Sequence, residues 1–362
     1  MFIGCNGWWR SWARALPIVV PIVVLLATLL SLTTLATDAG AQSIPNPRFS
    51  LPIDCEIGVS CFIQNYVDRD PTAGHTDYRC GHLSYDKHKG TDIRIRDLVA
   101  MRRGVTVLAA ADGVVKAARD GIDDVNVRVA GAESVRDRKA ENAVVLTHDD
   151  GYETIYAHLR KGSVVVKKGT RIKRGQRLGS VGLSGLTEFP HLHFEVRFNR
   201  SVIDPFTAGH MRAVCDSTTN SIDLQRWLWA MPVGKKLAFV GTGLIQAGFT
   251  DRKPDMAAIE ERKHDLVKLK RDAPALIFWG LVYGAKKGDT VTLKLFDPNG
   301  AILLENTSSV PGNKAQWLRF IGKRLKGGRW PRGTYRGQYQ LVRKAGRTET
   351  IVVNAQRALS VD

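Results

Sequence analysis

Short segments in which apolar and polar residues alternate recur from about residue 54 to residue 215. Alternation with a period of two places successive side chains on opposite faces of an extended strand, and the turns between these segments contain glycine. The pattern is typical of antiparallel hairpins. It predicts an all-β domain over residues 54–215, with strands at DIRIRD (92–97), NAVVLTH (142–148), YETIYAH (152–158) and HLHFEVRF (191–198).

A second group of strand-like segments follows within residues 216–362. The clearest are ALIFWGLVYG (275–284), DTVTLKLFDPNGAILLE (289–305) and GTYRGQYQLVR (333–343). We expect a second β domain there, resembling a sandwich, with a charged helix over residues 256–270. Residues 42–53 hold three prolines and are predicted to form a linker ahead of the first domain.

The N-terminal segment 1–41 has the character of a targeting sequence. Arg10 and Arg14 precede an almost wholly apolar stretch, and Ala39-Gly40-Ala41 supplies the small residues that a signal peptidase cleaves after. A cleaved signal peptide is favoured over an uncleaved membrane anchor, although about 20 apolar residues could span a bilayer. With either a signal peptide or an anchor, the rest of the chain is exported. Only an uncleaved anchor would attach it to the membrane.

The charge of the chain narrows the choice of partners. Lys and Arg number 53 against 35 Asp and Glu in 362 residues, a formal net charge of +18, which favours anionic partners. An exported protein does not meet nucleic acid, so an acidic polymer of the cell envelope is the better candidate. We therefore expect a location in the periplasm or the cell envelope and no nucleic-acid partner.

Four cysteines remain once the segment carrying Cys5 is removed. An even number in an exported chain suggests two disulfides, for which three connectivities exist. We favour Cys55–Cys61, which closes a short loop, and Cys80–Cys215, which joins the start of the first domain to its end. Zinc binding by thiolates is disfavoured because the sequence contains no C-x-x-C pair.

Two polar segments have open interpretations. The connection 119–141 is long for a hairpin and is either a functional lid or a tolerated surface loop. The stretch 311–347 holds eleven Lys or Arg, no acid and interleaved aromatic residues. It is either a docking face for an anionic polymer or, the interpretation we favour, an alternation that places rings in the core and charges in water.

Three short motifs in the first domain carry candidate chemistry. In His191-Leu-His193 the two imidazoles lie on one face of the predicted strand, with Glu195 and Arg197, above an apolar floor. His88-Lys-Gly-Thr-Asp92 is predicted to be a turn that enters a strand. Tyr156-Ala-His158 is predicted to be a second same-face pair. The remaining histidines are expected to be structural.

The combination of these motifs, with the run GLSGLTEFPHLHFEVR, resembles the LytM/lysostaphin-type zinc endopeptidases of peptidase family M23, over about residues 85–205. The resemblance implies one Zn²⁺ held by His88, Asp92 and His193, with His158 and His191 as catalytic imidazoles that are not ligands. It also implies peptidoglycan as the partner and its peptide cross-links as the substrate. Because some members lack activity, a non-catalytic wall-binding or hydrolase-activating protein is the alternative.

The chemistry of the implied ligand set agrees with this function. Three protein ligands leave the fourth tetrahedral position of zinc for water, as in catalytic sites, and such water has a pKa of about 7. His158 or His191 can then accept the proton of the water while the other stabilises the oxyanion. A D-Ala–diaminoacyl bond and a glycine bridge both remain candidates for the bond that is cut.

Overall fold

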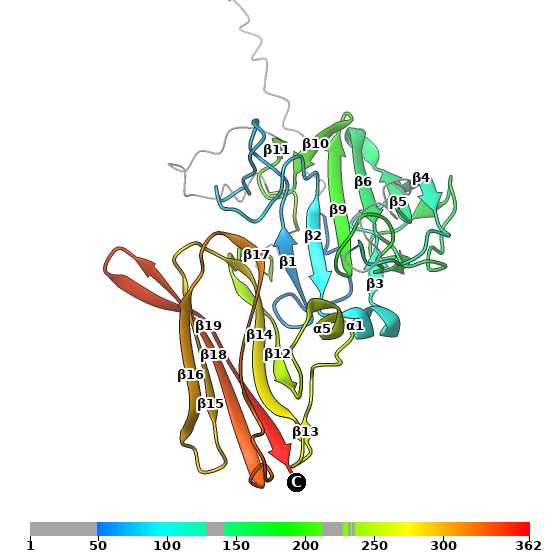
Figure 1. Cartoon of the computed structure of the whole chain (residues 1–362). Coiled ribbons are helices and arrows are strands. Elements are labelled where there is room, and N and C mark those ends of the chain that lie inside the picture. Colours follow the sequence, from blue (N-terminus) through cyan, green and yellow to red (C-terminus); the bar gives the residue numbers. More distant parts are fainter. Residues whose placement is uncertain (1–48, 128–140, 212–226, 231–232, 234–235) are drawn as a thin grey trace, which may run out of the picture. The chain divides into compact units, whose positions relative to one another are not determined.

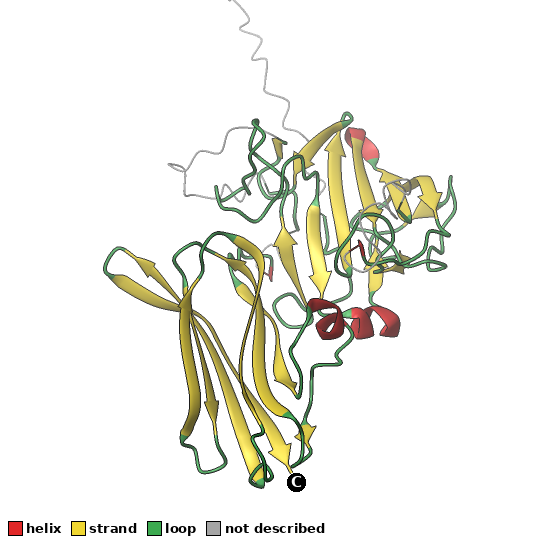
Figure 2. Cartoon of the chain, viewed as in Figure 1, coloured by secondary structure: helices red, strands yellow, loops and turns green. Residues whose placement is uncertain are grey.

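The structure is a computed structural model that describes residues 49–127, 141–211, 227–230, 233 and 236–362 (Figure 1). Strands dominate it and the helices are few and short (Figure 2), so the all-β prediction is confirmed. The predicted leader 1–41, most of the 119–141 connection and Cys215 lie outside the described residues. Across the described ranges, no helix combines the length and apolar character needed to span a membrane.

The first β region is built on an antiparallel sheet whose described strands run in the order β1-β2-β9-β6-β5-β4-β7, with β10 added beside β9 and β11 beside β10. Strands distant in sequence are therefore neighbours, because β2 pairs with β9 about a hundred residues later. The strands are β1 Cys61–Asn65, β2 Thr91–Ile95, β4 Gly113–Arg119, β5 Ala143–Thr147, β6 Tyr152–Ala157, β7 Arg171–Ile172, β9 His191–Phe198, β10 Ser201–Asp204 and β11 Gly209–His210.

Smaller elements complete this region. The helix α1, Leu98–Arg103, begins at Asp97, whose side chain accepts a hydrogen bond from the backbone N–H of Ala100, a favourable N-cap. Strands β3, Thr106–Leu108, and β8, Arg177–Ser180, form a two-stranded antiparallel sheet, and η1, Asp149–Gly151, is a single 3₁₀ turn before β6.

The alternation in β9 separates core from site. Leu192, Phe194 and Val196 are fully buried in the main hydrophobic cluster, whereas the intervening residues lie on the opposite face of the strand. Phe49, within the predicted linker 42–53, is also fully buried and packs edge-on against Phe194. One face of the sheet is thus fixed by apolar burial, which holds the polar face in a defined register.

The second β region contains two further sheets. Three strands, in the order β12-β14-β17, and five strands, in the order β13-β19-β18-β15-β16, share one hydrophobic cluster, as expected for a sandwich. The strands are β12 Gly243–Thr250, β13 Lys268–Leu269, β14 Ala275–Ala285, β15 Thr290–Phe296, β16 Ile302–Ser309, β17 Lys314–Arg324, β18 Gly333–Ala345 and β19 Thr348–Val361.

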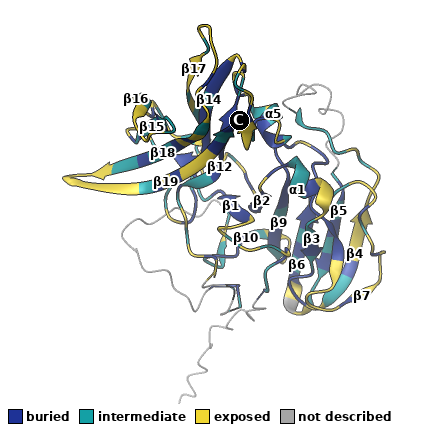
Figure 3. Ribbon diagram, turned by 90° about the horizontal axis from the view of Figure 1, so that it is seen from below, coloured by how far each residue is buried: buried dark blue, intermediate teal, exposed yellow. Residues whose placement is uncertain are grey.

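Two glycines let these sheets approach closely. A Cβ on Gly280 would lie 2.3 Å from the ring of Tyr339, and a Cβ on Gly337 would lie 2.2 Å from the ring of Phe278. Each aromatic ring therefore fills the space above a glycine of the facing sheet. Burial is concentrated in the inner strands, while the tip of the β18–β19 hairpin is exposed (Figure 3).

The helix predicted over 256–270 is wrong in its extent. The structure has a short helix α5, Met256–Glu260, capped at its start by Asp255. Arg262 then adopts a φ of 56°, in the left-handed region, which ends the helix. The remaining residues lead into β13, so the charged composition of the segment reflects an exposed turn.

The aromatic residues of 311–347 are partly buried in the core and partly exposed, so neither a docking face nor simple alternation describes all of them. Trp330, Tyr335 and Tyr339 are buried in the sandwich core, as the favoured interpretation expects. Phe320 is 41% exposed and Trp317 is half-buried. The alternation therefore explains most of these rings, and Phe320 is the exception.

The disulfide predicted between Cys55 and Cys61 is present, with the two Cα atoms 6.1 Å apart. It closes a short loop at the start of β1. The second predicted pair includes Cys215, which lies outside the described residues, so that pairing stays a prediction.

The two β regions belong to one compact unit and share contacts. Phe62 on β1 stacks on Tyr283 of β14 at a centroid distance of 4.6 Å, within an apolar cluster that also includes Ile245, Ile259 and Trp279. Helix α5 contributes Ile259 to this cluster, so the helix lies at the end of β2.

Candidate metal and catalytic site

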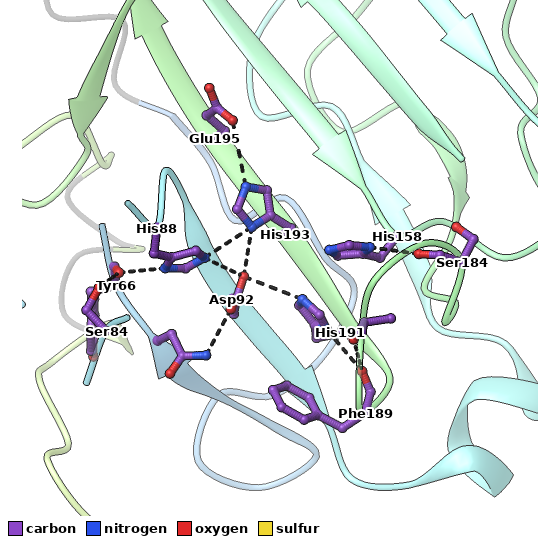
Figure 4. A network of polar contacts seen from close by, with 12 residues as sticks. Tyr66, Ser84, His88, Asp92, His158, Ser184, Phe189, His191, His193 and Glu195 are labelled. Carbon is purple, nitrogen blue, oxygen red and sulfur yellow. Dashed lines mark hydrogen bonds and ion pairs between the residues drawn. The ribbon is translucent and has the colours of Figure 1, made fainter. Parts of the chain in front are cut away.

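The pairing of β2 with β9 assembles the centre of the site. Asp92 lies directly opposite His193, and His88 is in the turn that precedes β2, as predicted. The Nε2 atom of His88 lies 3.0 Å from Oδ1 of Asp92, and Nδ1 of His193 lies 2.9 Å from that oxygen. The two nitrogens are 3.2 Å apart (Figure 4).

This geometry fits a metal ion. The three atoms belong to a group of potential ligands that lie within 4.8 Å of one another. Ligand atoms of a tetrahedral site with bonds of about 2.0 Å are roughly 3.3 Å apart, close to the spacing of these three atoms. His88 and Asp92 are almost fully buried. Lone pairs that converge in a buried site repel each other unless a cation lies between them.

Outer contacts orient each of the three side chains. Nδ1–H of His88 donates to the carbonyl of Tyr66 at 2.7 Å, which leaves the lone pair on Nε2. The amide of Asn65 donates to Oδ2 of Asp92 at 2.9 Å, which leaves Oδ1 toward the imidazoles. Such contacts fix the tautomer and orientation of metal ligands.

Glu195 has the corresponding role for His193. Its carboxylate lies 3.7 Å from Nε2 of His193, which favours the proton on Nε2 and the lone pair on Nδ1. Glu195 is itself held by Arg197, two residues further along the same face. The alternation in β9 placed Glu195 on this face but did not indicate a role, and no sequence signal pointed to Asn65 or Tyr66.

His191 and His158 lie beside the metal-ligand candidates with ring centroids 4.6 Å apart (Figure 4). Nδ1–H of His191 donates to the carbonyl of Phe189 at 2.9 Å, and Nδ1–H of His158 donates to that of Ser184 at 2.8 Å. Each ring therefore carries its lone pair on Nε2. That atom of His191 lies 3.5 Å from Oδ1 of Asp92.

The ionisation of the site follows from burial and charge. Burial, reinforced by His191 and His193, lowers the pKa of His158 to about 3, so this imidazole is neutral. Burial acts to raise the pKa of Asp92, but His88 and His191 outweigh it and hold this pKa well below its usual range. Burial acts to lower the pKa of His193, and Asp92 and Glu195 raise it to about 9.

The predicted same-face pair of Tyr156 and His158 is wrong. Tyr156 is buried in the core, where it packs on Phe194 and receives a hydrogen bond from the backbone N–H of Ala110. Strand β6 ends at Ala157, and His158 adopts a φ of 59° in the left-handed region. This change of backbone conformation breaks the alternation and directs the imidazole to the site face.

The other histidines include structural ones, as expected. His148 bonds the carbonyl of Asp112 through Nδ1 and the hydroxyl of Thr154 through Nε2. His264 bonds Thr250 and Asp255.

The sequence profile of peptidase family M23 matches residues 86–205. The peptidoglycan DD-endopeptidase ShyA of Vibrio cholerae is 38% identical over 109 residues, which are 30% of this chain and 20% of ShyA. The DD-carboxypeptidase/endopeptidase Mpg of Neisseria meningitidis is 31% identical over 109 residues, 30% of this chain and 23% of Mpg. This chain spans about a fifth of the length of the curated relatives it matches.

Two solved structures can be compared with parts of this chain. A zinc containing peptidase from Vibrio cholerae is 24% identical with a TM-score of 0.30, over 47% of this chain and 40% of that one. The catalytic domain of lysostaphin from Staphylococcus simulans is 23% identical with a TM-score of 0.26, over 39% and 85%. On the profile match and the identity to the curated relatives, residues 86–205 form a peptidase family M23 domain.

Proposed function

We propose that this protein is an exported zinc metalloendopeptidase that hydrolyses peptide cross-links of peptidoglycan. The observation that carries the proposal is the convergence of Nε2 of His88, Oδ1 of Asp92 and Nδ1 of His193, beside two further imidazoles. His88, Asp92 and His193 hold the ion in this proposal. His158 and His191 act on the substrate.

Zinc held by these three side chains would lower the pKa of a bound water and polarise the scissile carbonyl. Nε2 of His191 and Nε2 of His158 both carry a lone pair, because each Nδ1–H is committed to a backbone carbonyl. One of these imidazoles accepts the proton of the attacking water and passes it to the leaving amine. The other, in its protonated form in which Nε2 also carries a proton, stabilises the carbonyl oxygen as its negative charge develops.

The bond that we favour is a D-Ala–diaminoacyl cross-link. Support comes from relatives whose names describe DD-endopeptidases, ShyA and Mpg. A glycine bridge is the competing substrate. Digestion of isolated sacculi followed by mass spectrometry of the muropeptides distinguishes the two, since only the first converts directly cross-linked dimers into monomers.

The location we propose is the periplasm or the cell envelope. The disulfide between Cys55 and Cys61 supports it, because such bonds form and persist in oxidising compartments. The proposed substrate lies outside the cytoplasmic membrane as well.

We also propose that the second β region binds the cell wall through a basic hollow. A hollow of about 570 Å³ opens where β12, β14 and β17 meet, and Arg252, Lys253, Lys323, Arg324 and the exposed ring of Phe320 line it. Basic side chains beside a ring suit a polymer that carries carboxylates on a peptide and sugar scaffold. Asp251, also in the lining, is paired with Arg252 at 2.8 Å.

The test of the main proposal is a metal analysis combined with wall digestion. Purified protein from residue 42 onward should contain about one zinc per chain and release soluble muropeptides from sacculi, and a chelator should abolish both. A protein that binds zinc yet releases nothing would instead favour the non-catalytic alternative.

A further inference from the structure

A buried arginine lies on the same face of the sheet as the candidate ligands. Arg94 is two residues beyond Asp92 in β2, and it lies directly opposite His191 in β9. Its side chain is fully buried. The pairing of β2 with β9 thus places Arg94 and a candidate catalytic histidine at neighbouring positions of the sheet.

Polar and aromatic groups hold the guanidinium of Arg94 on several sides. One NH group donates to the amide oxygen of Gln64 at 2.9 Å, and the other forms an ion pair with Glu260 of helix α5. The guanidinium carbon lies 4.5 Å from the ring centroid of Phe189, within the range of a cation–π contact. Glu260 is 2% exposed and lies outside the M23 match.

Phe189 connects this arginine to His191. The carbonyl of Phe189 accepts Nδ1–H of His191, and the two rings lie with centroids 5.0 Å apart. The hydrogen bond to this carbonyl fixes the tautomer that leaves Nε2 free to accept a proton. A shift of Phe189 would therefore change the position of His191 and one of the two contacts of its Nδ1, the other being Oγ1 of Thr187 at 3.1 Å.

We propose that Glu260 is a positioning residue for His191, acting through Arg94 and Phe189. The carboxylate keeps the guanidinium against the ring of Phe189 and balances its charge beside the proposed metal site. The second β region thereby completes the catalytic half of the site. The inference rests on the proposed function only where it concerns catalysis, because the geometry of His191 can be measured without it.

Glu260→Gln is the first test, and its matched control is Glu261→Gln. Glu261 is the adjacent residue and pairs with Arg102 at 2.7 Å, but Arg102 is 51% exposed and Glu261 is 32% exposed. We expect Glu260→Gln to retain zinc and to lower kcat about tenfold to hundredfold with KM changed less than about twofold. Glu261→Gln should match the unchanged protein.

The replacement of both charged residues separates positioning from stability. Arg94→Met with Glu260→Met removes both charges of the buried pair together, and such replacements are often neutral or stabilising. We expect this double variant to fold, bind zinc and remain as slow as Glu260→Gln, because the contact that orients Phe189 is gone. Glu260→Asp should recover part of the lost kcat. Full activity of the double variant would overturn the proposal.

A spectroscopic measurement tests the same inference without catalysis. In ¹H–¹⁵N spectra of histidine rings of the metal-free protein, His191 should show a protonated, hydrogen-bonded Nδ1, assigned by its loss in His191→Ala. Glu260→Gln should shift or broaden that signal and Glu261→Gln should not. An unmoved signal would refute the positioning role, whereas inactivity of the unchanged protein would refute the proposed function alone.

Discussion

Gly90 lies against the imidazole of His193. A Cβ atom at position 90 would lie 2.7 Å from both Cε1 and Nε2 of that ring, and 2.8 Å from the carbonyl oxygen of Phe194. The backbone of the turn between His88 and Asp92 thus passes too close to β9 for any side chain. The absence of a side chain here lets the two halves of the candidate ligand set meet.

Gly90→Ala should therefore weaken metal binding. The added methyl must displace either the ring of His193 or the backbone of β9, so we expect zinc affinity to fall at least about tenfold. Competition with a chelating dye measures it. Gly312→Ala is the control, because a Cβ atom on Gly312 would meet no other atom within 4 Å and its φ lies outside the left-handed region. Equal affinity in both variants would contradict the role of the close approach.

Substitution of single histidines should separate metal binding from catalysis. We expect His88→Ala to lose the zinc, because it removes one of three converging ligand atoms, and His191→Ala to retain it. The activity of His191→Ala should fall roughly 10²- to 10⁴-fold, the usual contribution of a general acid or base. Zinc analysis and muropeptide release measure the two effects.

The control for these substitutions is His210→Ala in β11, which is exposed. It should keep both the zinc and the activity. Activity that survives in both His88→Ala and His191→Ala would refute the assignment of the site.

Charge reversal at the basic hollow should weaken wall association. Lys323→Glu with Arg324→Glu inverts two charges in the lining, so the fraction that sediments with sacculi should fall several-fold in low salt. Cleavage of soluble cross-linked muropeptides should fall much less. Lys344→Glu with Arg347→Glu, at the exposed tip of the β18–β19 hairpin, makes the same change of net charge elsewhere. Equal loss in both proteins would indicate an effect of net charge alone.

Removal of the disulfide should cost stability. A loop closed by Cys55 and Cys61 restricts the unfolded chain by an amount equivalent to about 2 kcal/mol. The double variant Cys55→Ala with Cys61→Ala should unfold at a lower urea concentration than the unchanged protein. Tryptophan fluorescence monitors the unfolding. An unchanged midpoint would mean that the loop is already ordered without the bond.

The sequence predicts which residues of a strand face the core better than it predicts which strands pair with each other. The period of two in β9 separates His191 and His193 from Leu192 and Phe194, because burial of alternate residues is a local property. The pairing of Asp92 with His193 depends on contacts between residues about a hundred positions apart, which a local pattern does not contain. The resemblance to a family supplied that pairing instead.

Two kinds of group that orient the site histidines could not be predicted from the sequence. The carbonyls that orient His88, His158 and His191 belong to the backbone, so the type of residue that provides them carries no information. Glu260 acts from a different β region, and a carboxylate in a charged segment is expected to be solvated. The left-handed conformation of His158 was equally hidden, since non-glycine residues seldom adopt it.

Strand β1 limits how short a fragment of this protein can be and still hold the candidate site. A fragment trimmed to residues 86–205 keeps the whole motif yet discards the amide of Asn65 and the carbonyl of Tyr66, which orient Asp92 and His88. It would also turn β2 from an inner strand into a bare edge. Grafting experiments should therefore carry the residues from Phe49 onward, because a complete motif is not a complete scaffold.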